Sequence, residues 1–299
     1  MRLASYNGGR IGRVDGAEIV DLTSLVASTQ PWPGPVPSPM RVLIARWDEL
    51  GGLASTADGP RTSLADAVLE PPVPDPTKVL AAPVNYADHQ AEMSVDSHVK
   101  SLGLFLKSPS SLLGPSGTVR LPYSDRRFDQ EGELALVIGR RAARITADPL
   151  SYVFGYTGLM DITMRGGEDR STRKSFATFT PMGPWIVTPD EFGDPEQVDL
   201  RCSVNGVVRQ SANTRELIWG VASLVEYASW ISPLLPGDVI TTGTPAGVDQ
   251  LLDGDRVELS LSGLGADLVV LVSDDGAVLS HTSGRDRGPT PPPSSRVAR

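Results

Sequence analysis

The stretch Glu131-Gly-Glu-Leu-Ala-Leu-Val-Ile-Gly139 decides the fold of this chain. Its short apolar run, bounded by glycines, is typical of a buried β-strand. Because side chains alternate along a strand, Glu131 and Glu133 project from the same face. Two neighbouring carboxylates in apolar surroundings repel each other and lose hydration, so they stay ionised only beside a positive charge. The stretch therefore predicts a strand with a cation site at its start.

A third acidic residue also has apolar neighbours in the sequence. Asp161 lies in Phe154-Gly-Tyr-Thr-Gly-Leu-Met-Asp-Ile-Thr163. Three carboxylates suit Mg²⁺, Mn²⁺ or Ca²⁺, so Glu131, Glu133 and Asp161 are candidate metal ligands. Spacing alone leaves an alternative equally open, because Glu-x-Glu is common: solvated or salt-bridged carboxylates at the mouth of a strand.

Composition disfavours two classes of protein. The 299 residues carry a net charge of −9 with a pI near 4.9 and no useful basic cluster, which argues against nucleic-acid binding. No apolar run approaches the roughly 20 residues of a membrane span, and the first residues lack the apolar segment of a signal peptide. The single cysteine, Cys202, fits a reducing compartment. We therefore expect a cytoplasmic protein that binds neither membranes nor nucleic acid.

Prolines divide the chain. Because Glu70-Pro-Pro-Val-Pro-Asp-Pro-Thr77 cannot continue a helix, we place a boundary there, between a small N-terminal α+β domain (residues 1–73) and a main domain (78–282). Many short apolar runs in the main domain favour a mixed, β-rich (α+β) architecture. Residues 283–299 lack apolar anchors and are expected to form a disordered tail. Local patterns predict a hairpin at 10–22 around Asp15-Gly16, and helices at Arg41–Leu53, Ser63–Leu69 and Thr214–Trp230.

A histidine and a glutamate lie three residues apart in Asn85-Tyr-Ala-Asp-His-Gln-Ala-Glu-Met93, which follows a predicted strand. On a helix, His89 and Glu92 would share one face. A carboxylate beside an imidazole orients it and raises its basicity, which suits proton abstraction. The pattern alone still favours a surface histidine with a helical neighbour.

Three cations and one threonine are candidate substrate contacts. Lys107, Arg165 and Lys174 could each bind a substrate carboxylate or a developing enolate beside the metal. Thr244 lies in a turn rich in glycine and threonine, whose amides and hydroxyl could bind an oxygen anion. Each of the three cations, taken alone, is more often a surface charge or a structural ion pair, and such a turn is more often only a turn.

Together these stretches resemble the fumarylacetoacetate hydrolase family, whose motifs stand here in the family's order over roughly residues 78 to 272. The matching blocks are Asn85-Tyr-Ala-Asp-His89 with Glu92, Phe105-Leu-Lys107, Glu131-Gly-Glu133-Leu, Asp161-Ile-Thr-Met-Arg165, Lys174-Ser-Phe, Pro181-Met-Gly-Pro-Trp185, Asn205-Gly206 with Gln210, Pro236-Gly-Asp238 and Gly243-Thr-Pro-Ala-Gly247.

The resemblance implies the family's β-roll catalytic domain, a small N-terminal domain and a homodimer. It implies Mg²⁺, with Mn²⁺ or Ca²⁺ as alternatives, bound by Glu131, Glu133 and Asp161. His89 and Glu92 would form a catalytic pair on a mobile segment, and Lys174 would contact the substrate oxyanion. The residues expected to build the substrate pocket are Tyr86, Lys107, Arg165 and Thr244.

The resemblance also implies the reaction class: hydrolysis of a C–C bond in a small anionic 2,4-dioxo acid such as fumarylpyruvate or maleylpyruvate, through a metal-stabilised enolate. Alternatives are isomerisation or decarboxylation of a 2-oxo-hept-ene-dioate or oxaloacetate, as in aromatic catabolism, and a non-catalytic ligand-binding relative. The chain departs from the family pattern at Met160, where Asn is usual, and at Glu168, where Gln is usual. We expect both departures to line the substrate face.

Overall fold

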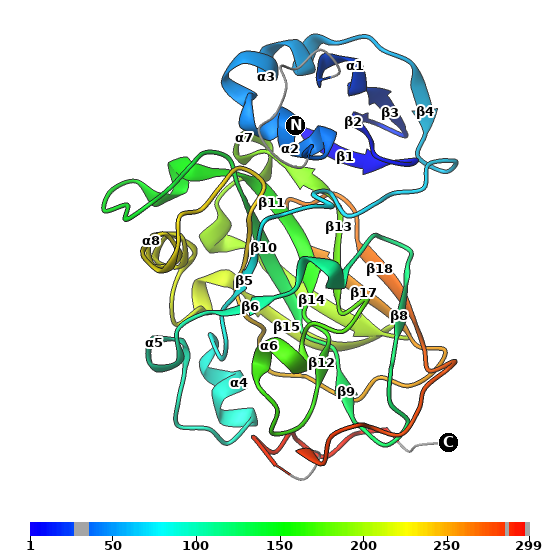
Figure 1. The fold of residues 1–299 in the computed structure, drawn as a ribbon, viewed down its shortest axis with the longest axis vertical. Coiled ribbons are helices and arrows are strands. Elements are labelled where there is room, and N and C mark those ends of the chain that lie inside the picture. Colours follow the sequence, from blue (N-terminus) through cyan, green and yellow to red (C-terminus); the bar gives the residue numbers. More distant parts are fainter. Residues whose placement is uncertain (27–35, 285–286, 297–299) are drawn as a thin grey trace.

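An 11-stranded sheet forms the centre of the computed structural model, which describes residues 1–26, 36–284 and 287–296 (Figure 1). Most neighbouring strands are antiparallel, and β16 with β5 and β13 with β7 are parallel pairs. The strands in spatial order are β4 (Arg61–Ser63), β3 (Glu18–Asp21), β2 (Arg10–Asp15), β1 (Arg2–Tyr6), β13 (Thr180–Val187), β11 (Val153–Met160), β10 (Gly132–Ile138), β16 (Val239–Thr241), β5 (Val79–Ala81) and β6 (Phe105–Lys107), with β7 (Leu112–Leu113) beside β13.

A second sheet packs against β10 and β11. Leu134 and Leu136 of β10 share a buried cluster with Leu259 and Val270 of the second sheet. A Cβ added to Gly132 would lie 2.9 Å from Leu259 Cδ1 and 3.0 Å from Cys202 Cβ, so glycine permits this close approach at the start of β10 without a shift of these side chains. The strands of the second sheet are β15 (Val207–Asn213), β14 (Asp199–Val204), β17 (Arg256–Leu261), β18 (Leu268–Ser273) and β8 (Thr118–Arg120), and a separate pair is β12 (Thr163–Met164) with β9 (Phe128–Asp129).

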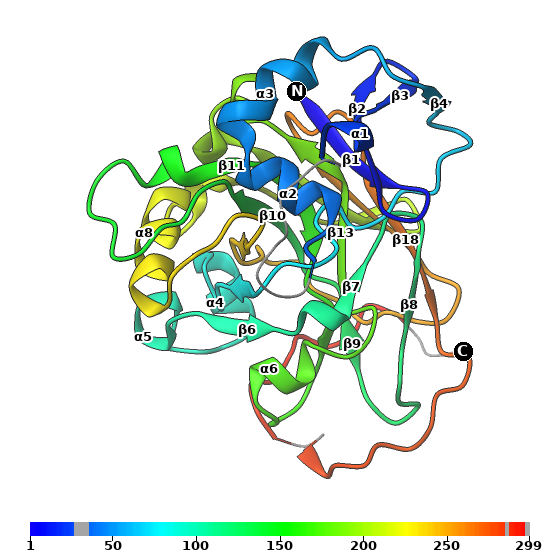
Figure 2. The ribbon, with the colours of Figure 1, turned by 45° about the horizontal axis from the view of Figure 1, so that its top comes forward.

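The helices are short and lie around the sheets. Helices α4, α5 and α8 lie on one side of the molecule in both views (Figures 1 and 2). In the parts of the chain that the structure describes, none of the helices has the length and apolar character to cross a membrane. The helices are α1 (Thr23–Val26), α2 (Pro39–Ala45), α3 (Trp47–Thr56), α4 (Ala87–Glu92), α5 (Val99–Leu102), α6 (Arg170–Arg173), α7 (Pro189–Phe192) and α8 (Val221–Ile231), with 3₁₀ turns at Pro109–Ser111, Pro149–Tyr152, Pro195–Gln197 and Thr214–Glu216.

The predicted mixed, β-rich architecture is confirmed, and so is the hairpin, in which Asp15 pairs with Glu18. The helix predicted over Arg41–Leu53 is wrong as one element, because the chain leaves helical geometry at Arg46 and forms α2 and α3. Trp47 packs edge-on against Phe154, with ring centroids 4.9 Å apart. This tertiary contact competes with a continuous helix.

Two other helix predictions also need correction. Over Ser63–Leu69 the chain ends strand β4 and then turns, and Val68 exchanges hydrogen bonds with Asn7 instead of forming a helix. The helix predicted from Thr214 begins at Val221. Before it, Thr214–Glu216 form a 3₁₀ turn and the next four residues are not helical, with the Ile218 and Trp219 amides donating hydrogen bonds to Asn85.

The N-terminal unit shares the central sheet with the main domain. Leu3 in β1 pairs with Ile186 in β13, so hydrogen bonds of one sheet run across the predicted boundary. The described part of the C-terminal segment contacts the main domain, since Pro292 accepts a hydrogen bond from Arg127 and Ser295 donates one to Asp249. The limits at 73, 78 and 282 and the disordered tail stay predictions, and residues 285–286 and 297–299 lie outside the described residues.

Candidate active site

The three candidate metal ligands converge at one end of the β10–β11 pair. Glu131 directly precedes β10, Glu133 is its second residue, and Asp161 directly follows β11. Antiparallel pairing places Gly132 opposite Met160, and the Asp161 amide donates to the Glu131 carbonyl at 2.8 Å. One carboxylate oxygen from each acidic residue lies within 4.8 Å of the others, and all three side chains are buried.

The negative charge of Glu133 is less well compensated than that of Glu131. Burial and the charge of Asp161 raise the pKa of Glu133 to about 8. Burial also opposes ionisation of Glu131, but Lys174 and Arg165 hold its pKa well below the ordinary value. A buried carboxyl that lacks positive charge, in a cluster of three hard oxygen donors, fits a divalent cation.

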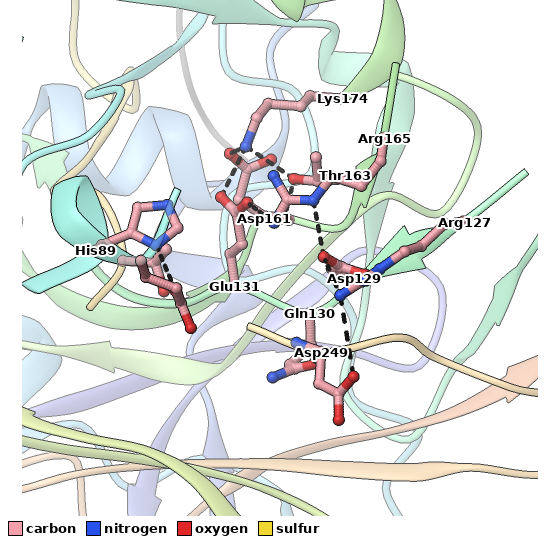
Figure 3. Close-up of polar contacts among 12 residues, drawn as sticks. His89, Arg127, Asp129, Gln130, Glu131, Asp161, Thr163, Arg165, Lys174 and Asp249 are labelled. Atoms are coloured by element: carbon pink, nitrogen blue, oxygen red, sulfur yellow. Dashed lines mark hydrogen bonds and ion pairs between the residues drawn. The ribbon is translucent and has the colours of Figure 1, made fainter. Parts of the chain in front are cut away.

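Two lysines contact the trio. The Lys174 ammonium uses all three of its hydrogens, on Glu131 Oε2 at 2.8 Å, Asp161 Oδ2 at 2.6 Å and Thr163 Oγ1 at 2.8 Å (Figure 3). Lys107 Nζ lies 2.5 Å from Asp161 Oδ1 and donates to the carbonyls of Lys174 and Phe179. Burial lowers the pKa of Lys107. Both lysines therefore compensate the carboxylates directly.

Arg165 extends the network to Asp129. Its Nε donates to Asp129 Oδ2 at 2.7 Å, and its Nη2 lies 3.0 Å from Glu131 Oε1 (Figure 3). Asp129 also accepts from Arg127 Nε at 2.7 Å. Burial alone would lower the pKa of Arg165, but the charges of Asp129 and Glu131 raise it. Sequence reasoning missed Asp129, because no spacing or motif distinguishes it from the other charged residues around it.

Gln210 fixes the backbone between the two metal-site glutamates. Its Oε1 accepts from the Gly132 amide at 2.8 Å, and its Nε2 donates to Thr244 Oγ1 at 2.7 Å. The Thr244 hydroxyl in turn donates to the Gly132 carbonyl at 3.0 Å. Although the family motif contains Gln210, only the structure indicates this positioning role, because Gln210 lies far from Gly132 in sequence.

His89 and Glu92 lie together on α4, as their spacing predicts. His89 Nδ1 is 2.9 Å from Glu92 Oε2, while Glu92 Oε1 accepts from the Gly247 amide at 2.8 Å. Both oxygens of Glu92 are therefore engaged. The imidazole is buried, which contradicts the alternative of a surface histidine.

Asn85 anchors the start of this segment. Its Nδ2 donates to the carbonyls of Trp219 at 2.9 Å and Thr242 at 2.8 Å, and its Oδ1 accepts from the Trp219 amide at 2.8 Å. Asn85 has no exposed surface. These three bonds join the segment before α4 to the segment before α8 and to the end of β16.

One pocket is lined by half of the predicted side chains. Residues that line it include His89, Glu131, Arg165, Lys174 and Thr244, together with Arg170, Arg173 and Pro289. Three other site residues do not line the pocket but contact its wall. Asp161 binds Lys174, Glu92 binds His89, and Glu133 accepts from the Gly243 amide beside Thr244. The pocket therefore faces the imidazole, one metal-site carboxylate and four cations.

Several expected residues do not line this pocket. Tyr86 is buried, its hydroxyl has no hydrogen-bond partner within the described residues, and burial together with Glu133 raises its pKa far above the ordinary value. Lys107 reaches Asp161 instead of the pocket. The expectation that Met160 and Glu168 face the substrate is wrong, because Met160 packs in the core and the Glu168 carboxylate binds Arg126.

A model of the fumarylacetoacetate (FAA) hydrolase C-terminal domain matches residues 78–268. The chain belongs to the fumarylacetoacetate hydrolase family. It is 42% identical over 287 residues to maleylpyruvate hydrolase of Aquipseudomonas alcaligenes, an alignment that covers 91% of this chain and 100% of that relative.

Solved structures support the same family assignment. Maleylpyruvate hydrolase from Sphingobium sp. SYK-6, in complex with manganese(II) ion and pyruvate, matches with a TM-score of 0.81 at 39% identity, covering 92% of this chain and 99% of that one. The 2-hydroxyhepta-2,4-diene-1,7-dioate isomerase from Mycobacterium marinum matches with a TM-score of 0.72 at 30% identity, covering 92% and 99%.

These findings confirm the predicted family, its fold and the metal-dependent hydrolase class of this fumarylacetoacetate hydrolase family member. The buried cluster of Glu131, Glu133 and Asp161 is its divalent-metal site. The individual roles of His89, Glu92 and the surrounding cations stay predictions.

Proposed function

We propose that this chain hydrolyses the C–C bond between C3 and C4 of a 2,4-dioxo acid of the maleylpyruvate type, releasing pyruvate and a carboxylic acid. The observation that carries the proposal is one pocket that joins the buried acidic trio to an oriented imidazole and to Lys174. The relatives named maleylpyruvate hydrolase, at 42% and 39% identity over nearly the whole chain, support this substrate class.

The pocket can perform the first half of such a reaction. A divalent cation held by Glu131, Glu133 and Asp161 would polarise the 2-oxo group and compensate the charge that develops on its oxygen. His89, oriented by Glu92 through Nδ1, presents its other ring nitrogen as the base that takes a proton from water. The resulting hydroxide adds to the C4 carbonyl of the substrate.

The second half breaks the C3–C4 bond, and its electron pair passes to C3 and the 2-oxo oxygen as an enolate. Lys174 lines the pocket, and the positive charge of its ammonium would stabilise that oxygen electrostatically. Protonated His89 returns its proton to C3, which yields pyruvate, while the C4 fragment leaves as a carboxylic acid. One water is consumed, and no redox partner is required.

The test is a substrate panel with the manganese-loaded protein, comparing maleylpyruvate, fumarylpyruvate, acetylpyruvate and oxaloacetate. We expect pyruvate and a second carboxylic acid from the dioxo acids. Glu131→Gln should abolish both Mn²⁺ binding in calorimetry and turnover. Glu226→Gln, the same change at an exposed position on α8, should alter neither. Isomerised dienoate or CO₂ without hydrolysis would favour the isomerase or decarboxylase alternative, and absence of any turnover would favour a non-catalytic relative.

Three finer features belong to the same proposal. We infer Mg²⁺ or Mn²⁺ as the resident metal, with Ca²⁺ possible in size but less suited to a compact trio. We infer a homodimer, which sedimentation equilibrium tests directly. We infer a cytoplasmic enzyme, which fractionation of the producing cells tests.

A further inference from the structure

Two arginines that line the pocket have no carboxylate partner among the described residues. The Arg170 guanidinium makes no hydrogen bond or ion pair with any described residue, and it is half-buried. Arg173 is 6% exposed, and its Nε donates only to the Glu168 carbonyl, at 3.1 Å. Burial lowers the pKa of both groups, and repulsion from Arg165 adds to this effect at Arg173. Charged groups in this state favour an anionic partner.

Three other arginines near the pocket already have carboxylate partners. Arg126 binds Glu168 through two parallel hydrogen bonds of 2.8 Å each, and Arg127 binds Asp129. Arg165 is paired with Asp129. Arg170 and Arg173 are therefore the guanidinium groups of the pocket wall that remain available to a ligand carboxylate.

Arg170 and Arg173 lie on the same side of one short helix. They are the first and last residues of the single-turn helix α6, and residues three apart lie on the same side of a helix. The preceding loop is held at several points: Arg126 donates to the Arg165 carbonyl at 3.0 Å and to Glu168, and the Gly167 amide donates to Gly284 at 2.9 Å. The guanidinium groups are thus presented from a fixed loop into the pocket that His89 also lines.

We propose that Arg170 and Arg173 bind the second carboxylate of a 2-oxo dicarboxylic acid, and so make the enzyme selective for dicarboxylates over 2-oxo monocarboxylates. This inference rests on the proposed function for the site that accepts the 2-oxo end. The metal trio and Lys174 would serve that 2-oxo end, and neither arginine makes a hydrogen bond or an ion pair with the trio. A substrate with one carboxylate would leave both arginines without an anion, whereas a dicarboxylate supplies one.

The experiment compares two substrates and two ligands on the manganese-loaded full chain. In Arg170→Gln and Arg173→Gln, kcat/KM for maleylpyruvate should fall roughly 10- to 100-fold, mainly through KM, because each change removes a charge-assisted hydrogen bond. The value for acetylpyruvate, which has a single carboxylate, should change less than about threefold, as expected for a group that it does not contact. Arg170→Lys should retain part of the preference. Arg201→Gln, an exposed arginine on β14, is the matched control and should behave as wild type.

Calorimetry separates this inference from the reaction. Binding of 2-oxoglutarate, a 2-oxo dicarboxylate, should weaken in both variants by the same factor as maleylpyruvate turnover, while pyruvate binding should stay unchanged. If the wild type hydrolyses none of the dioxo acids, the proposed function fails, but selective loss of 2-oxoglutarate binding still supports the arginine pair. Equal effects on the monocarboxylate and the dicarboxylate, or no effect on either, would overturn it.

Discussion

Glu92→Gln tests whether His89 acts as an oriented base. Glu92 Oε1 accepts from the Gly247 amide at 2.8 Å, and Oε2 lies 2.9 Å from His89 Nδ1. A glutamine can keep the Gly247 bond only if its amide oxygen faces Gly247. Its NH₂ group then faces His89 Nδ1 and donates to it, so Nδ1 becomes an acceptor and the proton moves to Nε2. The nitrogen that faces the substrate can then no longer accept a proton.

The magnitude follows from that change of tautomer. General-base catalysis contributes about 10²–10⁴ in rate, and an imidazole held in the wrong tautomer loses about as much. We therefore expect kcat to fall about 10²–10⁴-fold, which is about 3–5 kcal/mol of transition-state stabilisation. KM should change little, because Glu92 does not line the pocket, and Mn²⁺ affinity should be unchanged, because Glu92 touches none of the three acidic ligands.

The assay is steady-state release of pyruvate from maleylpyruvate, with thermal unfolding and Mn²⁺ calorimetry on the same samples. Combining Glu92→Gln with His89→Gln should cost no more than His89→Gln alone, because two residues that act as one unit are not additive. A variant that keeps more than a third of the wild-type kcat, or effects that multiply in the double variant, would refute the role of Glu92.

Three further outcomes follow from the same contacts. Asn85→Ala leaves three buried backbone groups without partners and should lower the free energy of unfolding by about 3–5 kcal/mol in urea titrations; a loss below about 1 kcal/mol would contradict the anchor. Hydrogen bonding to Arg126 lowers the pKa of Glu168 to about 2, so its stabilisation is complete above pH 4.5 and is lost as pH falls toward 2. The difference in stability between wild type and Glu168→Gln should therefore be up to about 3 kcal/mol at pH 7 and shrink steadily below pH 4.5; a difference that does not vary with pH would count against the pair. Burial raises the pKa of the Cys202 thiol to about 12, so a thiol reagent should label it only in denaturant, and rapid labelling of the native protein would contradict its burial.

The metal site can be predicted from the sequence because its pattern lies within one short stretch. Two glutamates two apart on one strand share a face whatever that strand packs against, and apolar neighbours imply burial. The pairing of β10 with β11, which brings Asp161 to them, follows only from the family motif. The same locality explains His89 and Glu92, whose spacing of three gives contact on any helix.

Long-range partners could not be predicted in this way. Gln210 reaches Gly132, and Asn85 reaches Trp219, across large distances in sequence, so composition and periodicity contain no sign of either bond. Before α8, a segment made of a 3₁₀ turn followed by non-helical residues accommodates the second contact. It replaces the first turns of a helix that the apolar pattern predicts from Thr214.

The departure at Glu168 illustrates how a change of residue can act without touching substrate. A glutamate in place of the family's usual glutamine adds a negative charge beside a pocket for which we propose an anionic substrate, and this charge would repel that substrate if the carboxylate faced it. The structure instead places that charge on Arg126, which neutralises it, while the Glu168 carbonyl binds Arg173. Glu168 thus neutralises its own charge on Arg126 through its side chain and holds Arg173 through its main-chain carbonyl.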